Sequence, residues 1–333
     1  MDVLVIGGSG FIGSRLIEVL TGQGHRVRNL DLRTSARFGE LTSIGDVRDI
    51  AAVEQAAHGC DAIVNLAAEH RDDVRPVSLY QSVNVDGAAA VVKAAEAGGV
   101  QRIVFTSTVA VYGLDKRSPT EQSPLEPFNE YGRTKAEAEQ VLTAWAAADP
   151  DRSLTIVRPS VVFGEGNRGN VYTLARQIAT RRFLMVGNGR NRKSMGYVGN
   201  VAAFLASCLT GPAGTRVINY ADKPDLPTRE LVSLIRRQLC GRDSRIPPIP
   251  RVLGMVGGWV FDLAARATGR TFPISAVRIR KFCAETTVDT SVVEASGFQR
   301  HYSLPEALRR TLEFEFPGGR VPAEIGEGIG ADS

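Results

Sequence analysis

Cysteine is scarce in this 333-residue chain, and its four copies lie far apart at Cys60, Cys208, Cys240 and Cys283. No CxxC pair occurs, so the spacing indicates neither a structural zinc site nor a disulfide framework. We predict no metal site. Because disulfides rarely persist in the cytosol, we expect reduced thiols and a cytoplasmic protein.

A long uninterrupted apolar run is missing as well. The sequence begins with MDVLVIGGSG, without a basic segment or a cleavage site before the apolar residues, so we expect no signal peptide. The apolar stretch from Val252 to Gly269 is interrupted by Asp262 and Arg266. Its apolar run is shorter than the roughly 20 residues that cross a bilayer. We expect no membrane span, and favour a buried or interface helix over a membrane-surface anchor.

Dense basic runs are also absent, although the formal net charge is +4. The arginines are scattered and are not interleaved with aromatic residues, so no nucleic-acid partner is predicted. A modest positive excess suits an anionic small-molecule substrate. Hydrophobic residues make up 43% and charged residues 23% of the chain, which is an ordinary globular composition for one large domain or two smaller ones.

The first half of the chain alternates apolar runs with runs of helical spacing. The apolar runs are residues 3–7, 25–31, 61–68, 102–108 and 154–160. The runs of helical spacing are residues 11–24, 49–59 and 82–99, and one that follows Tyr131. Continuous apolar strands that alternate with helices are typical of a parallel sheet covered on both faces. We therefore predict an α/β fold with a Rossmann-like, doubly wound parallel sheet.

A glycine-rich turn separates the first apolar run from the first helical one. Gly7, Gly10 and Gly13 have GxxGxxG spacing, and Gly8 completes a GxGxxG pattern. Small residues at such a turn let the backbone approach a pyrophosphate, which then lies at the start of the helix. Asp31 ends the next apolar run at the distance that a dinucleotide-binding unit requires. A purely structural turn is the alternative interpretation.

The acidic residue also bears on which dinucleotide binds. The Asp31 carboxylate would accept hydrogen bonds from a ribose hydroxyl and repel a 2′-phosphate, which favours NAD over NADP. Arg33 and Arg37 follow it, and either could accommodate a 2′-phosphate. We therefore predict NAD, with NADP as the alternative.

The order of the motifs along the chain resembles that of one family. The chain is similar to the extended short-chain dehydrogenase/reductase family, in its NAD-dependent nucleotide-sugar epimerase and dehydratase branch, which includes UDP-glucose 4-epimerase. The shared motifs are GGSGFIG, GDVRD, NLAA, the asparagine of SVNVDG, TSTVAVYG, YGRTK and RPSVVFGEG, which extend from residue 7 to residue 166.

The resemblance implies a catalytic trio of Thr108, Tyr131 and Lys135, with Ser107 as a weaker candidate for the hydroxyl. A phenol with its ordinary pKa of about 10 is a poor base at neutral pH, but a nearby ammonium favours the phenolate. Tyr131 and Lys135 are four residues apart and share a helix face. Tyr131 would take the proton of a sugar hydroxyl as hydride leaves C4. A YxxxK pair alone would also fit an ordinary helix start.

The resemblance also implies a set of cofactor contacts. Asp46 and Val47 would flank the adenine, and Asn84 would support the active-site helix. His70 would lie near the nicotinamide, although a loop histidine without a special role is an open alternative. The predicted cofactor-binding residues are Gly7, Gly10, Phe11, Ile12, Gly13, Asp31, Arg33, Asp46, Val47, Leu66, Ala67, Ala68, His70, Asn84, Thr106, Tyr131, Lys135 and Pro159.

The second half departs from the family pattern at three places. Lys193 stands where the family has a phosphate-binding arginine, which Arg190 or Arg192 could replace. A further phosphate ligand would be Arg278 or Arg280. Val161 stands where many epimerases have an asparagine. The predicted substrate-binding residues are Thr108, Val161, Lys193, Arg278 and Arg280.

The resemblance implies a dinucleotide-binding domain with the catalytic residues over 1–165. A mainly nucleotide-sugar-binding part over 166–318 would interleave with it, and 319–333 would be a flexible tail. A homodimer would form through the helix near residues 87–98 and the helix that starts at Tyr131.

The function expected from the resemblance is C4 epimerisation of a nucleotide-diphosphate hexose, most simply a UDP-sugar, through a 4-keto intermediate. An NAD(P)H-dependent 4-keto-sugar reductase is the alternative, and a non-catalytic NAD-binding regulator is a weaker one. A 4,6-dehydratase is disfavoured because Val109 and Ala110 stand where that chemistry uses an Asp-Glu pair. Polysaccharide or glycoconjugate precursor synthesis is the expected context.

Overall fold

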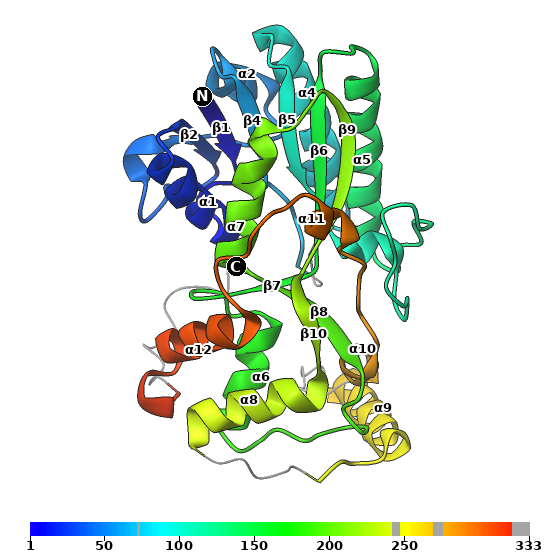
Figure 1. Ribbon diagram of the computed structural model, residues 1–333. Coiled ribbons are helices and arrows are strands. Elements are labelled where there is room, and N and C mark those ends of the chain that lie inside the picture. Colours follow the sequence, from blue (N-terminus) through cyan, green and yellow to red (C-terminus); the bar gives the residue numbers. More distant parts are fainter. Residues whose placement is uncertain (72–73, 242–246, 269–275, 322–333) are drawn as a thin grey trace.

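The computed structural model describes residues 1–71, 74–241, 247–268 and 276–321, without the side chains of residues 260–268, 277, 278 and 281. Within these residues, a large sheet covered by helices forms one end of the molecule, and a smaller α/β part forms the other (Figure 1). Of the predicted tail over 319–333, residues 322–333 lie outside the described residues.

The large sheet has seven strands in the order β3-β2-β1-β4-β5-β6-β9, and every neighbouring pair is parallel. Apolar residues on both faces of the strands explain the helices on either side. The strands are β1 Asp2–Ile6, β2 Arg26–Asp31, β3 Thr42–Ile44, β4 Ala62–Asn65, β5 Arg102–Thr106, β6 Ser153–Pro159 and β9 Gly214–Tyr220. The predicted doubly wound, Rossmann-like sheet is confirmed.

Two helical layers cover this sheet (Figure 1). One core lies between the sheet and α1 and α7, and the other lies between the sheet and α2, α4 and α5. The helices are α1 Phe11–Gly22, α7 Val198–Ser207, α2 Ile50–Ala57, α4 Gly87–Gly98 and α5 Glu130–Ala147. Because all seven strands are parallel, their carboxyl ends meet at one edge, where the loops of the site gather.

The smaller part is built around a three-stranded sheet in the order β10-β8-β7. Its strands are β7 Val161–Phe163, β8 Arg192–Tyr197 and β10 Asp222–Pro227. Helices α6, α8 and α12 pack on it around a separate apolar core. The helices of this half are α6 Asn170–Ala179, α8 Thr228–Cys240, α9 Arg251–Thr268, α10 Ala276–Cys283, α11 Ser291–Ala295 and α12 Leu304–Glu315. Strand β9 returns to the large sheet, so the two parts interleave.

The apolar stretch from Val252 to Gly269 forms α9, but the start of this helix is not buried. Val252 and Trp259 are 73% and 61% exposed, so the expectation of a buried helix is wrong for the described side chains. The physical reason is that glycines, not the bulky residues, face the rest of the chain. No helix in the described part of the chain is long and apolar enough to cross a membrane.

Candidate active site

The glycine-rich turn brings the start of α1 close to the loop after β4. Gly7 has a φ of 82°, and a Cβ there would lie 2.8 Å from the backbone nitrogen of Ala67. A Cβ on Gly13 would lie 2.5 Å from the Gly7 carbonyl oxygen. At Gly10, the N-cap of α1, a Cβ would approach only that same oxygen, and no side chain caps the helix. An uncapped helix start of this kind suits a phosphate.

Phe11 and Ile12 are the first two residues of α1. Both are half-buried, and both pack against the apolar core of the smaller part. Their side chains therefore hold the helix start, where a pyrophosphate would bind, against the second half of the molecule.

Asp31 ends β2 beside the glycine-rich turn. Its carboxylate accepts hydrogen bonds from the backbone N–H groups of Ser9 at 2.9 Å and Arg33 at 3.1 Å. Arg37 pairs through both terminal nitrogens with Glu18, at 3.0 and 2.9 Å. Of the two arginines that could accommodate a 2′-phosphate, Arg37 is therefore already engaged with Glu18.

Asp46 and Val47 follow β3, on the side of the sheet where the adenine is expected. Arg48 donates to the two carboxylate oxygens of Asp46 from Nε at 2.9 Å and Nη2 at 2.5 Å. These hydrogen bonds lower the pKa of Asp46. Val47 is buried, and a Cβ on Gly87 at the start of α4 would approach it to 3.0 Å. Both residues are therefore held in fixed positions.

Asn84 lies in a π-helical turn, Gln81–Asp86, that leads into α4. Its Oδ1 accepts from the backbone N–H of Glu69 at 2.9 Å, and its Nδ2 donates to the Glu69 carbonyl at 3.1 Å and to Thr134 Oγ1 at 2.9 Å. The amide thus fastens the loop that contains Leu66, Ala67 and Ala68 to α5. Single π turns recur at functional sites, and the sequence pattern did not predict this one.

The hydroxyl groups of Thr108 and Tyr131 meet at the carboxyl edge of the sheet. Thr108 follows β5 and accepts a hydrogen bond from the backbone N–H of Ala110 at 3.1 Å. Tyr131 lies in the first turn of α5, where Asn129 is the N-cap and accepts from the Gly132 N–H at 2.9 Å. Burial raises the pKa of Tyr131 to about 12, and a hydrogen bond with Thr108 opposes that rise.

Lys135 lies one turn further along α5 and is only 1% exposed. Its Nζ lies 4.0 Å from the centroid of the Phe105 ring, and no described residue accepts a hydrogen bond from it. Burial lowers the pKa of Lys135 to about 7, while the charge of Glu139 opposes the decrease. Thr106 Oγ1, at the end of β5, is also buried without a partner among the described residues. Buried polar atoms without partners are costly, so these two fit a bound dinucleotide.

The remaining predicted residues on this edge lie around Tyr131. The His70 side chain is exposed, and its ring centroid is 6.5 Å from that of Tyr131. Pro159 ends β6 opposite Tyr220 of β9. Ser107 is buried, with its backbone N–H bonded to β6 and its hydroxyl without a described partner. Of the two neighbouring hydroxyls, Thr108 is therefore the one in contact with the tyrosine.

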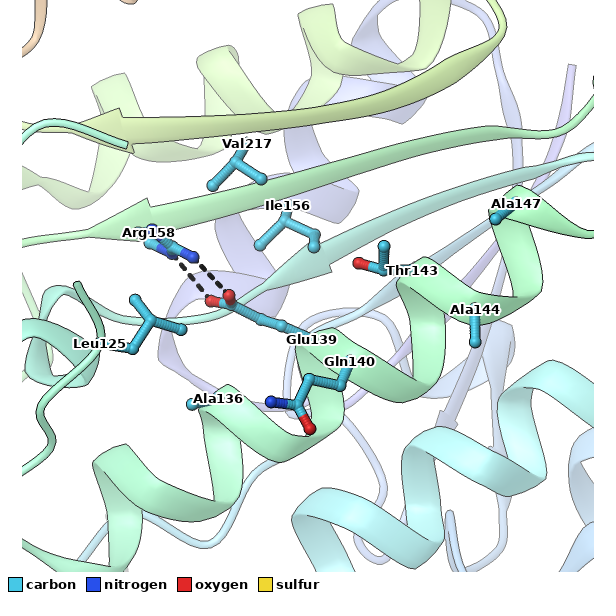
Figure 2. A pocket seen from close by; sticks show the side chains of 10 residues that line it. All are labelled: Leu125, Ala136, Glu139, Gln140, Thr143, Ala144, Ala147, Ile156, Arg158 and Val217. Atoms are coloured by element: carbon cyan, nitrogen blue, oxygen red, sulfur yellow. Dashed lines mark hydrogen bonds and ion pairs between the residues drawn. The ribbon is translucent and has the colours of Figure 1, made fainter. Parts of the chain in front are cut away.

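A buried ion pair joins α5 to β6 (Figure 2). Arg158 of β6 donates to the two carboxylate oxygens of Glu139 on α5, from Nε at 2.9 Å and Nη2 at 2.5 Å. Arg158 Nη1 also donates to the Tyr112 hydroxyl at 2.6 Å, and that hydroxyl donates to Asn219 Oδ1 at 2.7 Å. The network joins α5, β6 and β9, and its Glu139 lies one turn after Lys135 on α5.

Our sequence reasoning missed this pair, although two signals were present. An arginine within the apolar run 154–160 requires a buried acidic partner, and Glu139 lies four residues after Lys135 on one helix face. The pair also borders a largely apolar hollow of about 430 Å³ between α5 and the sheet. The other residues that line it are Leu125, Ala136, Gln140, Thr143, Ala144, Ala147, Ile156 and Val217. None of the predicted site residues lines the hollow.

The predicted substrate residues come from the smaller part and its junction with the large sheet. Val161 begins β7 and is partly exposed. Lys193 lies on β8, where its Nζ donates to the Ala284 carbonyl at 3.2 Å and burial lowers its pKa. Arg192 is exposed and donates to the Asp225 carbonyl at 2.7 Å. Lys193 is thus the more enclosed of these two neighbouring cations.

Of the two candidate arginines of α10, the structure describes the side chain of only one. Arg280 is exposed, and its Nη2 lies 4.0 Å from the carboxylate of Asp115. The side chain of Arg278 lies outside the described residues. Because Ala284 directly follows α10, the end of this helix lies beside Lys193.

Comparison with known proteins agrees with this geometry. A family model described as NAD dependent epimerase/dehydratase family matches residues 3–220. The N-acetyl-alpha-D-glucosaminyl-diphospho-ditrans,octacis-undecaprenol 4-epimerase of Escherichia coli O157:H7 is 50% identical over 319 residues, which is 95% of each chain. The UDP-glucose 4-epimerase of Vibrio cholerae is 29% identical over 326 residues, 94% of each chain.

Among solved structures, MoeE5 in complex with UDP-glucose and NAD matches with a TM-score of 0.74 and 25% identity, over 94% of this chain and 98% of that one. The chain belongs to the NAD-dependent epimerase/dehydratase family. It is an NAD-dependent enzyme of the extended short-chain dehydrogenase/reductase type, as its motifs predicted.

Proposed function

We propose that the protein is an NAD-dependent C4 epimerase of a hexose whose C1 is joined to a diphosphate. The observation that carries this proposal is the 50% identity, over 319 residues, with a protein named as a 4-epimerase of a diphosphate-linked sugar. The trio of Thr108, Tyr131 and Lys135 supports it, because its chemistry is proton transfer at a hydroxyl.

In this proposal each residue of the trio has one task at the C4 hydroxyl. Bound NAD supplies the site that accepts hydride from C4 and returns it to the opposite face of the ketone. Tyr131 takes the hydroxyl proton during oxidation and returns it during reduction. Thr108, which contacts the phenol, holds the substrate oxygen in line with it. Lys135 would hold the cofactor through a ribose hydroxyl, and its charge would favour the phenolate.

The residues beside the trio disfavour one related reaction, loss of water, and cofactor retention distinguishes a second. Val109 and Ala110 follow Thr108, so the carboxyl pair that would assist loss of water is missing at these positions. A 4-keto-sugar reductase would use the same trio but would exchange its dinucleotide at each turnover. Retention of NAD therefore separates the epimerase from the reductase.

The carrier attached to the diphosphate has two candidates. A nucleoside, as in a UDP-sugar, is the carrier expected from the family, and the Vibrio cholerae relative is named as a UDP-glucose 4-epimerase. A polyprenol is the second candidate, favoured by the name of the relative with 50% identity. Lys193 and Arg280 would contact the diphosphate, which is common to both.

Three finer points belong to the same proposal. The protein would act in the cytoplasm on precursors of a polysaccharide or glycoconjugate, and it would form a homodimer through α4 and α5. Light scattering tests the dimer directly, and the mass of a single chain would contradict it.

The first experiment is to denature the purified protein without added substrate and to identify the released dinucleotide by mass spectrometry. An epimerase should release NAD in nearly stoichiometric amount. C4 epimerisation is then assayed with UDP-hexoses and with a polyprenyl-diphosphate hexose in detergent. If the purified protein contains no dinucleotide and reduces a 4-keto sugar with NADPH, it is the reductase and not the epimerase. Absence of affinity for either dinucleotide would refute both.

A further inference from the structure

Helix α9 presents its bulky apolar side chains to the outside. Val252, Leu253, Val256 and Trp259 are all exposed, and Trp259 is 61% exposed. Residues spaced by three and four lie on one helix face, so Val252, Val256 and Trp259 form a continuous strip. In Figure 1, α9 lies at the end of the molecule opposite β1 and the other strands of the large sheet.

The opposite face of α9 is occupied by glycines that pack tightly against the protein. A Cβ on Gly254 would lie 2.4 Å from Val186 Cγ1, and a Cβ on Gly258 would lie 2.8 Å from the backbone of Ala276. Helices of globular proteins normally bury their apolar face and expose the polar one. The start of α9 reverses this pattern, and its neighbours leave no room for bulky side chains on the inner face.

The loop before β8 extends the exposed apolar surface. Leu184 is exposed, and the segment around it runs beside the residues that precede α9. The Ile249 N–H donates to the Met185 carbonyl at 2.7 Å, and the Gly187 N–H donates to the Ile249 carbonyl at 2.8 Å. We call Leu184, Val252, Leu253, Val256 and Trp259 the apolar patch.

The surroundings of the apolar patch are basic. Arg181 and Arg182 directly precede the segment that contains Leu184, and Arg251 begins α9; all three are exposed.

We propose that the apolar patch docks the protein on the surface of an anionic lipid bilayer. A helix whose first turns carry large apolar side chains on one face, with arginines beside it, has the composition of an interfacial helix. Trp is favoured at the boundary between headgroups and acyl chains, and each nearby arginine is attracted to anionic lipid. The apolar side chains would enter the acyl boundary while the flanking arginines meet the negatively charged headgroups.

The patch adjoins the elements that carry the predicted diphosphate ligands. Helix α10, which carries Arg280, packs against α9, and the residue after α10 contacts Lys193. As a consequence that rests on the proposed function, the enzyme takes its hexose from a diphosphate anchored in the bilayer by a polyprenyl chain. Docking itself requires neither catalysis nor a particular substrate.

Trp259 provides a direct test, because the only other tryptophan, Trp145, is buried. The full-length protein is mixed with vesicles of phosphatidylcholine and phosphatidylglycerol whose acyl chains carry bromine, which quenches tryptophan at the depth of the chains. We expect quenching of the Trp259 emission, and no quenching in Trp259→Phe, where only Trp145 emits. Unchanged emission in the presence of these vesicles would overturn the proposal.

A matched pair of substitutions tests the location of the surface by vesicle flotation. Val256→Glu should weaken partitioning by about tenfold or more, because it places a charge at the centre of the patch. Val292→Glu, on an exposed valine of α11, should bind as the wild type does. Pure phosphatidylcholine vesicles should bind more weakly than anionic ones. If both variants lose vesicle binding equally, or if the wild type binds both kinds of vesicle equally, the assignment of the apolar patch as the membrane-docking surface is contradicted.

Two controls separate this proposal from others. Tyr131→Phe should float with vesicles as the wild type does, so a failure of the proposed reaction would leave docking unaffected. Circular dichroism and the amount of released NAD should be unchanged in Val256→Glu. If light scattering shows that Val256→Glu dissociates a dimer and vesicles do not bind the wild type, the patch is an interface between copies and the proposal is wrong.

Discussion

At the scale of single residues, the site contains a lysine in a position that folding alone does not favour. Lys135 is buried on α5 with its ammonium against the Phe105 ring and without an acceptor among the described residues. Tyr131, one turn earlier on α5, is a phenol whose pKa burial raises to about 12. Both perturbations are of the kind that accompanies function, since desolvation is tolerated where a ligand completes the set of contacts.

Tyr131→Phe tests the proton-transfer role. Removal of the hydroxyl should lower kcat by about 10²- to 10⁴-fold, the usual contribution of a positioned acid–base group. Retention of NAD should be unaffected, as measured by mass spectrometry of the denatured protein. Tyr172→Phe, on α6, serves as the matched control and should retain its activity. A Tyr131→Phe enzyme with normal kcat would remove this residue from the mechanism.

Lys135→Met tests the cost of the buried ammonium. The pKa of Lys135 is about 7 in the folded protein and 10.5 in the unfolded chain. Between these two pH values the unfolded chain binds more protons than the folded protein. The contribution of Lys135 to the free energy of unfolding therefore rises with pH in this range. Without dinucleotide, the variant should be more stable than the wild type by about 1 to 4 kcal/mol near pH 7.

That advantage should shrink as the pH approaches 10.5, in urea unfolding measured at several pH values. Activity should be lost throughout. If the empty wild type is the more stable protein near neutral pH, Lys135 has an acceptor that the described residues do not include.

At the scale of elements, α5 is fastened to the sheet by charge as well as by apolar packing. The Glu139–Arg158 pair is buried on both sides and extends through Tyr112. Loss of one partner of such a pair leaves an uncompensated charge. The geometry of the helix that carries Tyr131 and Lys135 therefore depends on residues that touch neither substrate nor cofactor.

Glu139→Gln should destabilise the protein by about 3 to 5 kcal/mol, because Arg158 would remain buried without its countercharge. The double variant Glu139→Met with Arg158→Met should recover a large part of that loss, measured by urea unfolding. Since the charge of Glu139 opposes the lowering of the Lys135 pKa, Glu139→Gln should also lower that pKa further. Additive losses in the double variant would mean that the two side chains do not interact.

The elements of the large sheet were predictable from sequence, but two local conformations were not. The run 82–99 was recognised as helical from its spacing, yet apolar periodicity does not reveal that its first part is a π turn around Asn84. The run after Val252 was recognised as apolar, but its outward orientation depends on contacts of Gly254 and Gly258 with distant residues. In both cases tertiary contacts decide the outcome.

The same distinction applies to the site. The glycine turn and the YxxxK pair lie on short local motifs, so their positions followed from spacing alone. Thr108 contacts Tyr131, and the joint role of the two hydroxyls at a substrate stays a prediction. Arg158 and Glu139 are 19 residues apart in sequence, and no local sequence pattern identifies Glu139 as the partner of Arg158.

At the scale of the whole molecule, the chain crosses repeatedly between the two parts. Strand β9 of the large sheet pairs with β6 and lies in sequence between β8 and β10 of the smaller sheet, so neither part is a separate continuous segment. We therefore expect a single cooperative unfolding transition. Trp145 fluorescence and far-ultraviolet circular dichroism should give coincident urea curves for the empty protein. Separate midpoints would show that the parts unfold independently.

The unpaired ammonium of Lys135 has a consequence for the life of the protein in the cell. A newly made chain without dinucleotide retains the full cost of that buried charge, so it opens more often than a loaded chain and is a better substrate for proteases. Starvation for dinucleotide would thus lower the abundance of the enzyme as well as its activity. Quality control by proteolysis would leave mainly the copies that are ready to work.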